Sequence, residues 1–345
     1  MTQYEQWQQF LSTDNTSKEL PVPIENYLHD LSDLGIIAVS GEDASTFLQG
    51  QLSGDMNDLT NDQYIFSSLN TLKGRCVATL TIIKIEGIIH LILSKDLISS
   101  VMSTLNKYIV FSQASLHDKS DELILFGLSG NMPSSLTLKN STALTPKNNM
   151  SQTGTQTTLY IPGHKPRYLF IAPYTQAKDT WLRISEEASL GSPKLWELAD
   201  IEAGSVRVNA VISEQFLPHN LNLHLTGAVN FEKGCYTGQE IIARMQYRGK
   251  LKNQVYLCQI HAQASSETDS ELLAGSSISS IQNDTAKSIG EIINIVMQTP
   301  GNYRALVSLP VDIQTKTLPT QLQVKDKEIS LNELKVPGYA INKRQ

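Results

Sequence analysis

Residues 231–240 bring together side chains that could do chemistry. They include a thiol at Cys235, an ammonium group at Lys233 and two glycines that let the backbone approach a ligand closely. Thr237, followed three residues later by Glu240, has the pattern of a capping box, which predicts the start of a helix. The free N–H groups of a helix start and a nearby ammonium group favour a thiolate. The spacing therefore predicts an activatable sulfur at the positive end of a helix.

The helix predicted after this loop has two faces. Ile241, Ile242 and Met245 lie on an apolar face. Glu240, Arg244 and Arg248, spaced four apart, lie where opposite charges can pair. A buried cysteine in a packing loop is the alternative, because a lone cysteine is more often structural than reactive. A packing loop does not need the whole set of functional residue types found here, namely Lys233, Gly234, Cys235, Tyr236, Thr237, Gly238, Gln239 and Glu240.

A second candidate stretch runs from Trp196 to Gly204. Glu202, near the end of a predicted helix, has a carboxylate that could bind an aminopyrimidine with two hydrogen bonds, as in a pterin ring. Trp196 could stack on a planar ligand. The alternative is a surface glutamate and a core tryptophan, which composition alone favours.

No metal or iron–sulfur cluster is expected to be stably bound. His219 and His224 have no evident third ligand, so they are interpreted as loop or surface histidines. The three cysteines are far apart and form no CxxC pair, which argues against a disulfide framework, a zinc site and a cluster held within one chain. The spacing suits a reducing compartment.

Composition places the chain among ordinary globular proteins. Its 345 residues include 40% hydrophobic and 18% charged residues, and the net charge is -6. That charge argues against direct binding to nucleic acid through a strong positive field. The most apolar region, 77–102, is broken by charged residues, so no membrane span is expected, and the N-terminus shows no signal peptide. A cytoplasmic location is the expectation.

Hydrophobic periodicity predicts both strands and helices before residue 250. Strands are expected at 34–39, 64–70, 76–86, 88–93, 123–128, 157–161 and 168–172, and helices at 44–52, 96–110, 175–189 and 195–203. After residue 250 the pattern changes to short strands with turn signals between them, typical of a small β-barrel or sandwich. These later strands are expected at 255–260, 277–281, 288–297, 303–309, 322–324 and 328–331.

The stretch from Lys233 to Glu240 resembles the signature of the YgfZ-type folate-binding proteins. These are bacterial relatives of the aminomethyltransferase (T-protein) of the glycine cleavage system and of a mitochondrial iron–sulfur assembly factor. The resemblance covers about residues 25–250 and implies an aminomethyltransferase-like folate-binding fold, with three domains around a central opening and a C-terminal β-barrel. The implied parts are a lead-in (1–24), a discontinuous folate-binding α+β domain (25–50 with 122–250), an inserted ferredoxin-like α+β domain (51–121) and a small β-barrel (251–345).

The resemblance also implies a ligand and site residues. Tetrahydrofolate or a derivative would lie between Trp196 and Glu202, while Cys235 would do thiol or redox work with positive charge from Lys233 and Arg244. A second folate-associated tryptophan of the family falls at Leu34, where this chain departs from the pattern.

The resemblance suggests an accessory protein that supports assembly or repair of iron–sulfur enzymes, including tRNA-modifying ones. Its implied partners are folate and iron–sulfur enzymes or assembly proteins. One alternative is an aminomethyl transferase that uses tetrahydrofolate, but Ala78 and Thr79 stand where the T-protein has an essential carboxylate pair. A non-catalytic folate-sensing scaffold is the other alternative. The residues alone do not decide whether a reaction is catalysed.

Overall fold

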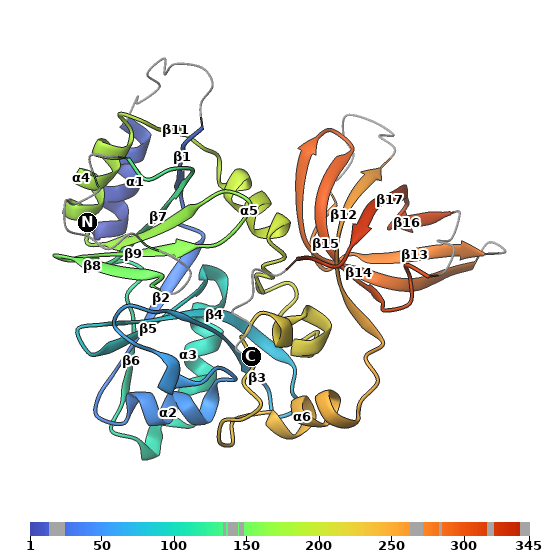
Figure 1. Cartoon of the computed structure of the whole chain (residues 1–345), viewed down its shortest axis with the longest axis horizontal. Helices are drawn as coiled ribbons and strands as arrows, with labels where there is room; N and C mark the ends of the chain where they lie inside the picture. The colour runs from blue at the N-terminus through green and yellow to red at the C-terminus, as the bar shows by residue number, and fades with distance from the viewer. Residues whose placement is uncertain are drawn as a thin grey trace. The chain divides into compact units, whose positions relative to one another are not determined.

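The computed structural model describes residues 1–13, 25–133, 136, 144, 148–262, 272–282, 285–315 and 321–338 (Figure 1). The chain divides into two compact units. Unit 1 comprises residues 1–67 and 80–196, and unit 2 comprises residues 68–79 and 197–345. This division groups the chain differently from the predicted domains, whose boundaries stay a prediction.

The first sheet belongs to unit 1 and has the strand order β11-β1-β7-β10-β9-β8. Its pairs are antiparallel except for β1 with β11. Figure 1 shows α1 (Gln3–Thr13) and α4 (Tyr174–Ile184) beside this sheet, where Trp7, Phe126 and Trp181 pack edge to face or tilted in one core. The strands are β1 (Tyr27–Asp30), β7 (Ile124–Ser129), β8 (Met150–Thr153), β9 (Gln156–Ile161), β10 (Arg167–Ala172) and β11 (Ser189–Leu190).

The second sheet has the order β3-β4-β5-β2-β6. Its strands are β2 (Leu34–Ser40), β3 (Ile65–Asn70), β4 (Cys76–Ile85), β5 (Ile88–Ser94) and β6 (Ser115–Asp118). Two helices accompany it, α2 (Ala44–Gln51) and α3 (Ile98–Asn106), with short 3₁₀ turns η1 (Met56–Asp58), η2 (Lys95–Leu97) and η3 (Ile109–Phe111). Phe47 and Leu48 are buried on α2.

Unit 2 contains a closed six-stranded barrel with the order β12-β15-β14-β13-β16-β17. The predicted C-terminal β-barrel is therefore confirmed, and each predicted strand there matches an observed one. The strands, drawn in orange to red in Figure 1, are β12 (Asn253–Ala262), β13 (Ser277–Gln282), β14 (Thr285–Thr299), β15 (Asn302–Pro310), β16 (Leu322–Val324) and β17 (Lys327–Lys335). Apolar side chains from all six strands, such as Tyr256 and Ile292, fill its interior.

The remaining elements carry the candidate sites. They are α5 (Pro193–Glu202), η5 (Pro218–Leu221), η6 (Leu223–Leu225) and α6 (Gln239–Arg248). In the part of the chain that the structure describes, no helix is both long and apolar enough to cross a membrane.

Candidate functional site

The loop before α6 is closed by its own hydrogen bonds. Asn230 Oδ1 accepts the backbone N–H groups of Glu232 at 2.7 Å and Lys233 at 2.9 Å, which turns the chain at the loop entry. At its exit, the Gln239 side chain donates to the Gly234 carbonyl at 3.4 Å. These hydrogen bonds lie before and after Cys235 in the chain and hold the loop that carries it.

Helix α6 begins at Gln239, and its N-cap is Gly238 with φ 82° and no side-chain cap hydrogen bond. The predicted capping box places the N-cap at Thr237, so the observed N-cap lies one residue later, and the hydrogen bonds of that capping box stay a prediction. The residue before the helix adopts a left-handed conformation that glycine takes without steric penalty.

Position 238 requires glycine both because of its positive φ and because the backbone of another turn approaches it closely. A Cβ atom there would lie 2.5 Å from the Thr71 carbonyl oxygen and 3.1 Å from Gly74 Cα. Gly74, with φ +70°, in turn faces Ile241 of α6, which a Cβ atom would meet at 3.1 Å. The turn between β3 and β4 therefore contacts the start of α6 backbone to backbone, which braces the cysteine loop.

The sulfur of this loop is presented to solvent while its neighbours are buried. Cys235 is exposed, whereas Lys233 is 9% and Tyr236 is 6% exposed. The Lys233 ammonium group lies 5.2 Å from the centre of the Tyr236 ring. Burial raises the pKa of Tyr236 to about 12, so this phenol stays neutral. The predicted effect of Lys233 on the Cys235 thiol stays a prediction.

The other two thiols lie in cores. Cys76 begins β4 at 1% exposure, within the strand predicted at 76–86, and Cys258 on β12 is 0% exposed. Burial raises the pKa of each thiol to about 12. Only Cys235 among the three thiols is placed to react with a molecule in solution.

Helix α6 buries Ile242 completely and leaves Arg244 exposed. Within the described residues, no ion pair joins Glu240 to Arg244, although the spacing permits one. Arg244 therefore offers its guanidinium group to solvent rather than to its own helix.

The two histidines before the loop form a tilted ring pair. The rings of His219 and His224 lie 4.7 Å apart between centroids, and His219 Nε2 lies 3.1 Å from Gln246 Oε1 on α6. Burial lowers the pKa of His219, and it lowers the pKa of His224 to about 4, with the His219 ring as a smaller cause. His219 is only 3% exposed, so its interpretation as a surface histidine is wrong. Among the described residues, no group of three or more His, Cys, Asp or Glu side chains is placed to hold a metal ion.

Trp196 lies on α5 within unit 1, where it is 4% exposed. The guanidinium carbon of Arg167 lies over the Trp196 ring, 4.8 Å from its centre, and the ring centres of Trp196 and His29 are 5.6 Å apart. The Trp196 ring also packs against Gly127, where a Cβ atom would lie 2.4 Å from the ring. Leu34 packs against the same hydrophobic cluster. Stacking of Trp196 on a ligand stays a prediction, and in this arrangement it would require the ring to leave these contacts.

Glu202, the last residue of α5, lies within unit 2 and is held by an arginine. Arg304 on β15 donates from Nε to Glu202 Oε1 at 2.6 Å and from Nη2 to Oε2 at 3.2 Å. A third bond from Arg304 Nη1 reaches Glu333 at 2.8 Å. Burial opposes the charge of Arg304, but the two carboxylates outweigh it and raise its pKa. The carboxylate predicted to bind folate is therefore already engaged along its bidentate edge.

Sequence reasoning missed three of these residues. Arg304 could have been found as a lone arginine within the apolar run 303–309, because a buried cation requires a carboxylate partner. Gly74 and Asn230 carry turn chemistry that sequence alone does not connect to a particular loop. The structure brings together the loop residues and Gly74, and it brings Glu202 together with Arg304.

The fold is that of an aminomethyltransferase. The glycine cleavage system aminomethyltransferase T from Bartonella henselae superposes with a TM-score of 0.65 at 15% identity, covering 91% of this chain and 86% of that one. At this identity the likeness defines the fold class alone, and it confirms the predicted class.

The chain belongs to the family of the tRNA-modifying protein YgfZ. The YgfZ protein of Colwellia psychrerythraea strain 34H is 34% identical over 255 residues, which cover 71% of this chain and 76% of the relative. The YgfZ protein of Yersinia pestis strain Pestoides F is 30% identical over 230 residues, covering 66% of this chain and 69% of the relative. No family model matches the chain.

Proposed function

We propose that this chain is a folate-binding accessory protein of the cytoplasm that supports assembly or repair of iron–sulfur enzymes, including enzymes that modify tRNA. The observation that carries the proposal is the exposed thiol of Cys235 on a loop braced by Asn230, Gln239 and the contact of Gly238 with Gly74. A thiol that is held in place and accessible can react, as its thiolate, with a ligand or with a group on a partner protein. A loop that served packing alone would bury the sulfur.

The tRNA connection rests on the names of the relatives, which are called tRNA-modifying proteins. The net charge of -6 disfavours a stable complex with tRNA, since such binding depends on neutralising phosphates. The role in tRNA modification is therefore proposed to act through iron–sulfur enzymes rather than by direct contact.

Folate fits the predicted residues in part. Arg304 occupies the bidentate edge of Glu202, but a carboxylate has about four acceptor positions, and the Glu202 side chain is 28% exposed. Glu202 can thus accept further N–H groups from a pterin without losing Arg304. Trp196 and Leu34 are engaged in the core of unit 1, so Glu202 carries the proposed folate contact.

An aminomethyl transferase is the alternative enzyme, and the residues at the critical position disfavour it. Ala78 is fully buried, and Thr79 Oγ1 accepts the backbone N–H of Val208 at 3.1 Å. Neither side chain can serve as a carboxylate base or stabilise a developing cation. Both instead serve packing and a backbone hydrogen bond.

Folate binding is tested by calorimetric titration of tetrahydrofolate into the wild-type protein and two variants. Glu202→Gln should weaken binding at least tenfold, because the ionic acceptor is lost. Glu333→Gln is the matched control: it changes the other carboxylate on Arg304 and should bind tetrahydrofolate like wild type. No binding to wild type at millimolar ligand would contradict the folate part of the proposal.

The thiol is tested separately in cells that lack the endogenous protein. The content of nucleosides made by iron–sulfur tRNA-modifying enzymes is measured by mass spectrometry after complementation. Cys235→Ser should fail to restore it, while Cys76→Ser, a change at a buried thiol, should restore it if the protein folds. If Cys235→Ser restores the nucleosides and Glu202→Gln does not, the folate-sensing scaffold is the correct function.

A further inference from the structure

The strand β6 leaves an open edge on the second sheet. It stands last in the strand order, and among the strands that the structure describes it pairs with β2 alone. The Lys119 N–H donates to the Ile36 carbonyl at 2.8 Å, in register with the pairing of the two strands. Because backbone groups alternate in direction along an antiparallel strand, those of Leu116 and Asp118 point away from β2. No backbone hydrogen bond of these two residues to another described residue completes that side.

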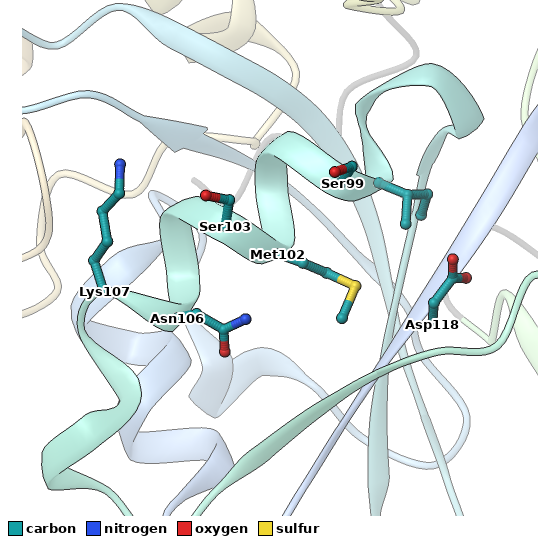
Figure 2. Close-up of a pocket in the computed structure, with 7 residues that line it drawn as sticks. Ser99, Met102, Ser103, Asn106, Lys107 and Asp118 are labelled. Carbon is teal, nitrogen blue, oxygen red and sulfur yellow. The ribbon is translucent and has the colours of Figure 1, made fainter.

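A groove lies between this edge and helix α3. It has a volume of about 700 Å³ and lies wholly within unit 1. Figure 2 shows Met102 reaching from α3 toward Asp118 of β6, with Lys107 on the opposite side of the groove. The other labelled lining residues, Ser99, Ser103 and Asn106, are small or polar. The groove therefore offers one flexible apolar contact with charged residues at its two ends.

The charges of the groove are available for a ligand. Lys107 follows the last turn of α3 and Asp118 ends β6, and neither forms an ion pair with another described residue. Asp118 accepts one hydrogen bond, from the Ser120 N–H at 2.9 Å. The segment that joins α3 to β6 exposes apolar side chains as well, since Val110 is 74% and Phe111 is 96% exposed.

We propose that this groove binds an extended peptide segment of a partner protein, which adds to β6 as an antiparallel strand. Backbone groups of the peptide would pair with Leu116 and Asp118, and an apolar side chain would lie against Met102. In the antiparallel direction, a basic residue near the amino end of the peptide meets Asp118. An acidic residue or the terminal carboxylate meets Lys107 at the other end.

The strand edge and the groove together favour a peptide as the occupant. An unpaired strand edge presents backbone N–H and C=O groups that can pair with another strand. Here the edge adjoins a groove with an apolar contact at Met102 and opposite charges at its ends, which favour one backbone pairing and one polarity of an occupant.

The test uses a dye-labelled seven-residue peptide that begins with lysine, alternates valine with threonine and ends with glutamate. Its binding to the full chain is followed by fluorescence anisotropy. Saturable binding is expected, and it should weaken at least tenfold for a peptide with alternate backbone nitrogens methylated. Because recognition is mainly through the backbone, lack of binding at millimolar protein would overturn the proposal.

Two pairs of variants locate the binding. Leu116→Pro removes the outward N–H and is tolerated at an edge, so it should weaken binding at least tenfold, whereas Leu116→Ala keeps the N–H and should bind like wild type. Lys107→Glu should weaken binding, and exchanging the lysine and glutamate of the peptide should restore it. Thermal denaturation confirms that each variant is folded.

Another segment of this chain, or a second copy of it, could occupy the β6 edge instead, and each would give a different experimental result. Protection of the Leu116 amide from hydrogen exchange in the free monomer would mean that another segment of this chain covers the edge. Dimerisation in the ultracentrifuge that Leu116→Pro abolishes would assign the edge to a second copy. Either result, or equal binding by both Leu116 variants, would overturn the peptide proposal.

Discussion

At the scale of single residues, the same chemical group has opposite properties at different positions of the chain. Cys235 is exposed on a braced loop, while Cys76 and Cys258 are buried with their pKa raised to about 12. Since the thiolate is the reacting form, burial suppresses both the access and the ionisation of the latter two. Thiol reactivity is therefore confined to the position that the proposed function requires.

Alkylation of the native protein should modify Cys235 alone. With iodoacetamide at pH 8, mass spectrometry should find one label per chain in the folded protein and three after denaturation in urea, since the chain has three cysteines. The Cys235→Ser variant is the control and should take up no label while folded. Native labelling of Cys76 or Cys258 would contradict the burial on which this selectivity rests.

Sequence patterns identify some of these residues but not their contacts. Cys235 could be selected because an unusual density of functional residue types surrounds it. The engagement of Glu202 by Arg304 could not, because the two are brought together from α5 and β15 by tertiary structure. The position of the N-cap was missed for a related reason, since the turn at Thr71 and Gly74, distant in sequence, approaches the backbone at Gly238.

At the scale of elements, the β3–β4 turn and the start of α6 are joined through glycines, and this contact can be tested. Gly238→Ala places a Cβ atom 2.5 Å from the Thr71 oxygen at φ +82°. A left-handed conformation alone costs an L-residue about 1–2 kcal/mol, so a loss of more than about 2 kcal/mol is expected in urea denaturation. Gly234→Ala, in the same loop with nothing within 4 Å, is the matched control and should change stability by less than about 0.5 kcal/mol.

The end of α5 is connected to the barrel by Arg304, whose side chain is 7% exposed. Glu202→Ala removes two of its hydrogen bonds and leaves the buried cation with Glu333, so a loss of about 2–3 kcal/mol is expected in urea denaturation. Glu333 is 62% exposed, and Glu333→Ala should cost less than about 1 kcal/mol. Equal losses in the two variants would mean that Glu202 does not hold Arg304 in solution.

Element prediction succeeded where local pattern and turn chemistry agree. All the barrel strands after residue 250 were predictable, since short apolar runs alternate there with turn residues; β16 matches its predicted range, 322–324. The short strands β1, β6, β8 and β11 were missed, because each is held by its neighbours in the sheet rather than by its own periodicity. The sequence pattern therefore did not predict the strand edge at β6.

At the scale of the whole molecule, buried histidines occur in both units and connect stability to pH. Burial lowers the pKa of His29 in unit 1 and of His224 in unit 2 to about 4, and His90 and His219 shift in the same direction. An unfolded histidine has a pKa of about 6.5. Between these values the unfolded chain binds more protons than the folded one, so stability present above about pH 6.5 is lost as the pH falls toward 4.

Urea denaturation at pH 7, 6 and 5 should therefore show a midpoint that decreases with acidity, each buried histidine contributing at most about 1.4 kcal/mol per pH unit in that window. His29→Gln and His224→Gln should each flatten this dependence, because glutamine does not titrate. His164→Gln changes an exposed histidine and should retain the wild-type slope. If the midpoint is constant from pH 7 to 5, or if all three variants keep the wild-type slope, the buried rings are not neutral in the folded protein. His224 packs on His219, and His219 contacts Phe231 of the cysteine loop and Gln246 of α6. A flattened slope in His224→Gln would therefore also connect acid stability to the segment that presents the thiol.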